Sequence, residues 1–102
     1  MLPKLLVINT TVESLEQAEL MAKALVNEKL AACVHYSAIN SMYRWQGKVE
    51  KASEWSLRIK ADLSMLENLL KWIAKNHPYE VPELWWQEAT TTSEYAEYIQ
   101  GT

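Results

Sequence analysis

Residues 55–73 read WSLRIKADLSMLENLLKWI, and the spacing of the hydrophobic residues changes within this stretch. Up to Ala61 apolar and polar residues alternate, which is typical of a strand with one buried face and one polar face. From Leu66 onward apolar residues return at intervals of three and four, which predicts an amphipathic helix. Pro78 ends that helix, because a proline disfavours helical backbone at the residue before it. A strand followed by a helix is therefore the unit around which we place the rest of the chain.

The start of the chain has the same order. Residues 5–9 form a continuous apolar run, which predicts a buried strand. Ser14 precedes Gln17 by three residues, and this capping-box spacing predicts the start of a helix over residues 15–28.

Residues 32–45 show no helical periodicity and predict a long strand, with a break expected near residues 38–40. Gln46-Gly47 then predicts a hairpin turn into the strand that ends at Ala61. Each arm of this hairpin is about twice as long as an average strand. We therefore expect the hairpin to extend beyond its own sheet.

Residues 81–88 predict a last strand, and Pro82 near its start indicates a sheet edge. Residues 93–99 predict a short C-terminal helix. The order of elements predicts an α+β fold of the ferredoxin-like βαββαβ type, with an antiparallel sheet and an extended central hairpin. We expect a single domain over residues 1–102, because two separate cores in so short a chain would be too small.

Composition excludes several classes of protein. The chain has 102 residues, of which 49% are hydrophobic, and this is too apolar for an intrinsically disordered protein. The net charge of −3 and the pI of about 5.4 provide no basic surface for nucleic acid. No apolar run is long enough to span a membrane or to form a signal peptide. Together with the single cysteine, this leads us to expect a cytoplasmic protein.

The aromatic residues predict self-association. There are five Trp and five Tyr but no Phe. Trp85 and Trp86 are adjacent, so in a strand one indole must face away from the helix layer. A bare sheet face that carries indoles is typical of a partner surface. We therefore expect a homo-oligomer sealed by the hairpin and this face, with a Trp-rich monomer core as the alternative.

The sequence does not predict an enzyme. It contains no Gly-x-Ser-x-Gly motif, and its only aspartate, Asp62, lies at a predicted helix start. With only two glycines it also lacks a phosphate-binding loop or a dinucleotide fingerprint.

Metal binding is the stronger chemical hypothesis. Cys33 and His35 lie two residues apart and share a strand face, so that two soft ligands converge. His77 follows a helix and precedes Glu80 and Glu83. The alternative is that Cys33 is a small core residue, His35 a strand-face residue and His77 a helix terminator.

Three motifs, taken together and in order, resemble the CutA divalent-cation tolerance family. They are LVNEKLAACV at residues 25–34, MYRWQGKVE at residues 42–50 and HPYEVPE at residues 77–83. The similarity covers nearly the whole chain. It implies a compact homotrimer of ferredoxin-like subunits, related in architecture to the PII-type signalling proteins, in which the long hairpin strands pair across subunits.

The resemblance implies a non-enzymatic protein that binds copper or another divalent cation and requires no cofactor. The alternative is a PII-like regulatory trimer that senses a small ligand at the cleft between subunits and signals to a protein partner. By match to the motifs, the residues expected to line this cleft are Tyr43, Trp45, Lys60, His77, Tyr79 and Glu83.

His77 and Glu83 are the expected cation contacts, and Cys33 is a weaker one. Some family members carry Cys and His at two positions that are occupied here by Asn9 and Asn76. Because an amide is a poor ligand for a soft metal, this difference predicts weak copper binding.

Overall fold

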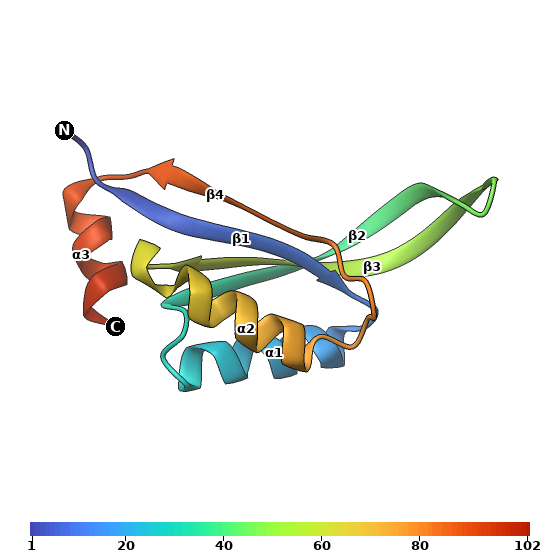
Figure 1. Ribbon diagram of the computed structural model, residues 1–102, viewed down its shortest axis with the longest axis horizontal. Coiled ribbons are helices and arrows are strands. Elements are labelled where there is room, and N and C mark those ends of the chain that lie inside the picture. Colours follow the sequence, from blue (N-terminus) through green and yellow to red (C-terminus); the bar gives the residue numbers. More distant parts are fainter.

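A computed structural model describes residues 1–102. One antiparallel sheet has the strand order β2-β3-β1-β4, and two helices cover one of its faces while a third lies at one end (Figure 1). The predicted ferredoxin-like βαββαβ arrangement with an additional C-terminal helix is confirmed. The elements are β1 (Lys4–Val12), α1 (Leu15–Asn27), β2 (Cys33–Trp45), β3 (Lys48–Ala61), a 3₁₀ turn (Leu63–Met65), α2 (Leu66–Asn76), β4 (Leu84–Thr90) and α3 (Ser93–Gly101).

The core lies between the sheet and the two covering helices. Its main cluster joins alternate residues of β1 and β3, such as Ile8 and Leu57, to the apolar faces of α1 and α2. Leu25 of α1 and Ile73 of α2 are both 0% exposed. The spacing that predicted the two helices therefore also fixes which of their faces are buried.

β1 is longer than the sequence indicated. The apolar run predicted residues 5–9, but the strand continues through Thr10 and Thr11, which are 1% and 5% exposed. Thr10 is paired with Leu57 of β3 and Leu84 of β4, whereas Thr11 is paired with Ser56 of β3 alone and its carbonyl oxygen lies 3.0 Å from His77 Nε2. A central strand can bury polar residues when its neighbours satisfy their hydrogen bonds.

The central hairpin is continuous, so the break expected near residues 38–40 is wrong. Every residue of β2 pairs with a residue of β3. A break would cost the two strands some of the backbone hydrogen bonds that this pairing provides. Gln46 and Gly47 form the two-residue turn with φ of 49° and 79°, as a type I′ turn requires. β1 pairs with β3 only as far as Trp55, so residues 48–54 of β3 have β2 as their sole neighbour. The hairpin accordingly projects well beyond the sheet (Figure 1).

β4 begins at Leu84, three residues later than predicted, and lies at a sheet edge as Pro82 indicated. Trp85 and Trp86 stand beside Asn9 and Ile8, on opposite faces of the sheet. Ile8 belongs to the core beneath the helices, so Trp85 lies on the other face and the prediction that one of the two faces away from the helix layer is confirmed. The two tryptophans are 47% and 44% exposed. None of the helices has both the length and the apolar character needed to cross a membrane.

Candidate functional site

The loop at residues 77–83 is held to the sheet by its histidine. His77 Nδ1 accepts a hydrogen bond from the Tyr79 backbone N–H at 3.0 Å. In the neutral ring the proton therefore lies on Nε2, which is 3.0 Å from both the Thr11 carbonyl oxygen and Thr10 Oγ1. The Thr10 hydroxyl in turn donates to the Glu83 carbonyl oxygen at 2.6 Å. Thr10 thus joins the two ends of the loop.

Burial keeps this histidine uncharged. Desolvation lowers the pKa of His77 below its usual 6.5, and the hydrogen bond to the Thr11 carbonyl opposes this only in part. Protonation would also remove the Nδ1 lone pair that accepts from Tyr79. The neutral ring is therefore the form that fits its surroundings.

A cavity of about 560 Å³ lies between this loop and the projecting hairpin, and we call it the hairpin cavity. Four of the residues predicted to line a cleft line it together. They are Tyr43 and Trp45 from β2, and Tyr79 and Glu83 from the loop. His77 does not itself line the cavity, but its ring lies next to the Tyr79 ring, with 5.2 Å between the two centroids.

The hairpin cavity is acidic. Glu13, Glu54 and Glu83 line it, and none of its lining residues is a lysine or arginine. The Tyr79 hydroxyl donates to Glu54 at 3.5 Å. Burial raises the pKa of Tyr79 above 10.0, and the nearby carboxylates of Glu54 and Glu13 raise it further. A site of this kind favours cations or neutral hydrogen-bond donors over anions.

Glu83 is positioned by an indole. Trp85 Nε1 donates to Glu83 Oε2 at 2.9 Å, which orients the carboxylate while leaving its other oxygen free. The chain's only ion pair joins Lys71 to Glu67 on α2, so no basic side chain neutralises Glu83.

Two of the predicted site residues lie elsewhere. Lys60 stands over the Tyr95 ring, with its ammonium 5.7 Å from the centroid, and lines a different cavity. Cys33 is paired with Lys60 across the hairpin, and His35 is paired with Arg58. Each soft ligand of the predicted Cys33–His35 pair therefore has a cation directly beside it, which opposes metal binding there.

No three side chains among the histidines, cysteine, aspartate and glutamates lie close enough together to hold a metal ion. Glu13 and Glu54 were missed as cavity residues in the sequence. Glu13 directly follows a buried strand, and Glu54 is a polar residue just before the alternating segment of β3, so neither position carried a motif. The antiparallel pairing of β1 with β3, which ends with Val12 opposite Trp55, brings them together.

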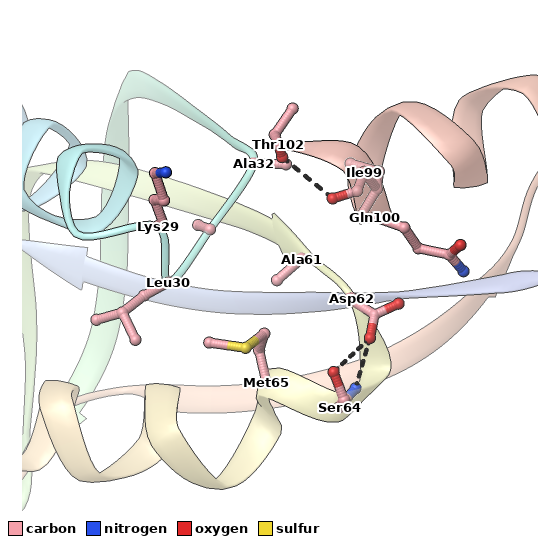
Figure 2. Close-up of a pocket in the computed structure, with 11 residues that line it drawn as sticks. Lys29, Leu30, Ala32, Ala61, Asp62, Ser64, Met65, Ile99, Gln100 and Thr102 are labelled. Atoms are coloured by element: carbon pink, nitrogen blue, oxygen red, sulfur yellow. Dashed lines mark hydrogen bonds between the residues drawn. The ribbon is translucent and has the colours of Figure 1, made fainter.

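A second cavity, of about 300 Å³, lies where α3 meets the exit of α1 and the start of α2. Figure 2 shows that its two charged residues, Lys29 and Asp62, stand on opposite sides. The Asp62 carboxylate already accepts hydrogen bonds from Ser64, and the Thr102 hydroxyl donates to the Ile99 carbonyl. Its carboxylate and its threonine hydroxyl are thus engaged within the chain, and none of the predicted site residues lines it.

A family model described as CutA1 divalent ion tolerance protein matches residues 6–102. The chain belongs to this family. The resemblance seen in the three motifs is thereby confirmed over nearly the whole sequence. The family's description refers to tolerance of divalent ions and names no reaction.

Relatives in this family span plants and bacteria. The chloroplastic protein CutA of Arabidopsis thaliana is 44% identical over 80 residues, which cover 78% of this chain and 44% of that protein. The chain thus spans less than half the length of this plant relative. The divalent-cation tolerance protein CutA of Thermus thermophilus is 43% identical over 79 residues, which cover 76% of this chain and 77% of that one.

The fold is shared with solved structures of the family. The structure of CutA from Synechococcus elongatus superposes with a TM-score of 0.94 at 30% identity, covering 99% of this chain and 92% of that one. The extended hairpin and the C-terminal helix are therefore features of this chain's relatives as well.

Proposed function

We propose that this chain is a non-enzymatic, cytoplasmic CutA protein that forms a homotrimer and binds divalent cations, copper among them, weakly at the hairpin cavity. The observation that carries the proposal is the charge of that cavity. Three carboxylates line it without a basic partner, beside the loop that carries His77, although they lie too far apart to hold one ion together. Unneutralised carboxylates attract divalent cations.

Within the cavity, Glu83 is the first contact for the cation, because one of its oxygens is free. His77 is the second contact, but a metal can bind to its ring only by breaking existing hydrogen bonds. A metal at Nδ1 has to displace the Tyr79 N–H, and a metal at Nε2 has to displace a proton together with two oxygen partners. Cys33 is the weakest contact, because it lies beside Lys60. These costs account for weak rather than tight binding.

Surfaces that a lone chain leaves uncovered support self-association. β2 and β4 are free sheet edges, and the projecting hairpin exposes apolar side chains. Trp45 and Val49 are 62% and 68% exposed. Free edges and a patch of this kind favour pairing with further copies of the chain.

The cavity's size favours one alternative. A volume of about 560 Å³ is much larger than a single ion and lies in the range typical of small-molecule sites. A PII-like regulator that senses a small, neutral or cationic ligand there, and reports it to a protein partner, is therefore the second candidate.

Calorimetric titration of Cu²⁺ tests the proposal. We expect weak binding to the wild type, weaker binding to Glu83→Gln and to His77→Ala, and unchanged binding to Glu80→Gln. Glu80 is an exposed carboxylate in the same loop that does not line the cavity, so it is a matched control. The absence of binding heat in the wild type contradicts the cation proposal and favours the regulator. An equal loss in Glu80→Gln indicates adsorption to the surface and also contradicts it.

A further inference from the structure

The cavity drawn in Figure 2, which we call the helix-end cavity, lies at the end of the molecule away from the projecting hairpin (Figure 1). Its lining residues come from the segment after α1, from the end of β3 with the turn that follows it, and from the end of α3. Ala61 is the only one of them that belongs to the sheet, and it is part of the core beneath the helices. Copies that meet through the hairpin and the opposite sheet face therefore leave this cavity open.

The Asp62 carboxylate is held in this cavity through one of its two oxygens. Oδ2 accepts hydrogen bonds from the backbone N–H and the hydroxyl of Ser64, so that Asp62 caps the turn before α2. Oδ1 has no hydrogen-bond partner in the chain, and the chain's only ion pair lies on α2. The cavity therefore presents one oriented, negatively charged acceptor to a ligand.

Lys29 supplies a cation on the opposite side of the cavity (Figure 2). Its φ of 60° is left-handed, a conformation that a glycine adopts without strain. Backbone strain of this kind is concentrated at functional sites, where the side chain has a use that offsets the loss of stability. The Lys29 ammonium has no ion-pair partner in the chain. A lysine at this position is thus unfavourable for the fold and is available to an anion.

The surface between these two charges is apolar. Ala61 and Met65 lie between Lys29 and Asp62 in Figure 2, and Leu30 lies beside them. Ala61 is 1% exposed, and the other two side chains pack against the main core. A rigid apolar floor that separates a cation from a carboxylate fits a ligand with two opposite charges joined by an apolar chain. A ligand with one charge would leave either Lys29 or Asp62 without a partner.

We propose that the helix-end cavity binds a small zwitterion of the ω-amino acid class, whose ammonium group meets Asp62 Oδ1 and whose carboxylate meets the Lys29 ammonium. Its methylene chain packs on Ala61 and Met65. The volume of about 300 Å³ is at the lower end of the range for small-molecule sites. The site is independent of cation binding at the hairpin cavity, since the two cavities share no lining residue.

Four probes test the proposal by calorimetric titration of the full chain: 6-aminohexanoate, hexanoate, hexylammonium and glycine. We expect 6-aminohexanoate to bind at least about tenfold more tightly than hexanoate or hexylammonium, because each of these lacks one charge-assisted contact. Glycine should also bind more weakly, because its adjacent charges cannot reach both sides of the cavity. Amide chemical shifts should change at Lys29, Ser64 and Gln100, which all line the cavity.

Two variants separate binding from folding. Lys29→Gly relieves the left-handed backbone and removes the ammonium, so it should be more stable than the wild type yet bind 6-aminohexanoate at least about tenfold more weakly. Asp62→Asn retains a side-chain oxygen that can cap the turn but removes the charge, and it should weaken binding similarly. Lys23→Gln and Glu97→Gln remove exposed charges of α1 and α3 outside the cavity, so they should leave binding unchanged.

Three outcomes overturn the proposal. One is that 6-aminohexanoate does not bind at millimolar concentration. Another is that hexanoate or hexylammonium binds as tightly as the zwitterion, which would show that only one of the two charges is used. The third is that Lys23→Gln or Glu97→Gln weakens binding as much as Lys29→Gly and Asp62→Asn do.

Discussion

His77 connects the loop to the sheet through Nε2 and accepts a hydrogen bond from within the loop through Nδ1, and this arrangement requires a neutral ring. Because burial lowers its pKa below 6.5 in the folded chain, the unfolded chain binds more protons just below that pH. The stability contributed by this residue is therefore complete above about pH 6.5 and is lost as the pH falls through the lowered folded-state pKa.

Urea denaturation of the wild type and of His77→Gln at several pH values measures this effect. We expect the difference in midpoint between the two proteins to be largest at neutral pH and to shrink on acidification toward about pH 5. Taking the difference removes the contribution of the glutamates, which both proteins share. A difference that is constant with pH, or that grows on acidification, contradicts the assignment of a neutral ring.

Lys29 occupies a position that favours glycine. It follows α1 with φ of 60°, and the next two backbone N–H groups return to the Leu25 carbonyl oxygen. Left-handed backbone is unfavourable for a residue with a Cβ atom. We expect Lys29→Gly to stabilise the chain by about 0.5–1 kcal/mol in chemical denaturation.

Gly47 provides the converse control, because its φ is 79° and no atom lies near a Cβ placed there. Gly47→Ala should therefore destabilise through backbone strain alone, by about 1 kcal/mol. If both variants shift stability in the same direction, the left-handed assignment at Lys29 is contradicted.

For single residues, the sequence predicted which of them belong to the candidate site better than it predicted what surrounds them. The motif residues Tyr43, Trp45, Tyr79 and Glu83 do line one cavity. Lys60 does not, because it lies near the other end of β3, away from the projecting part of the hairpin, and lines a different cavity. The contacts of His77 Nε2 depend on Thr10 and Thr11, which are distant in sequence and carry no signal for this role.

Among the elements, β3 determines most of the fold. It pairs with β2 along its whole length and with β1 over its second half, and its inward residues enter the main core. The strict alternation in its second half made this strand the clearest prediction from sequence. The break expected in β2 was wrong because small polar residues there indicate a loop, whereas pairing with β3 overrides local preference.

Leu57 tests the importance of β3, since it is 0% exposed at the centre of the core. We expect Leu57→Ala to lower the free energy of unfolding by about 2–5 kcal/mol, through lost burial and the cavity left behind. Leu20→Ala is the control, because Leu20 is 63% exposed on α1, and it should change stability by no more than about 0.5 kcal/mol. Equal losses in both variants would contradict the assigned core, and thermal and urea unfolding measure them.

For the whole molecule, the sequence predicted self-association from the number of indoles. The exposed Trp85 and Trp86 support that reasoning, but a single chain does not reveal how many copies assemble. The number of copies depends on how the surfaces of folded chains fit together, and no local sequence pattern records it.

Light scattering of the wild type should give a mass three times the 11.8 kDa of the chain. Trp85→Lys places a charge on the face opposite the helix layer, and we expect it to lower that mass in a concentration-dependent way. Lys51→Gln is the control and should leave the mass unchanged. A wild-type mass near 11.8 kDa, with the chain still folded, contradicts the proposed homotrimer.

The projecting ribbon at residues 39–54 also bears on the order in which the molecule is built. Two strands without a third neighbour or a covering layer are only marginally stable in water. In a newly made chain the tip should therefore fray, and its amide hydrogens should exchange with solvent freely up to the point where Trp55 meets Val12. Beyond that boundary the amides are protected from the start. In the proposed homotrimer we therefore expect the outer half of the ribbon to acquire lasting structure only when copies meet, so that for this segment folding and assembly are a single event.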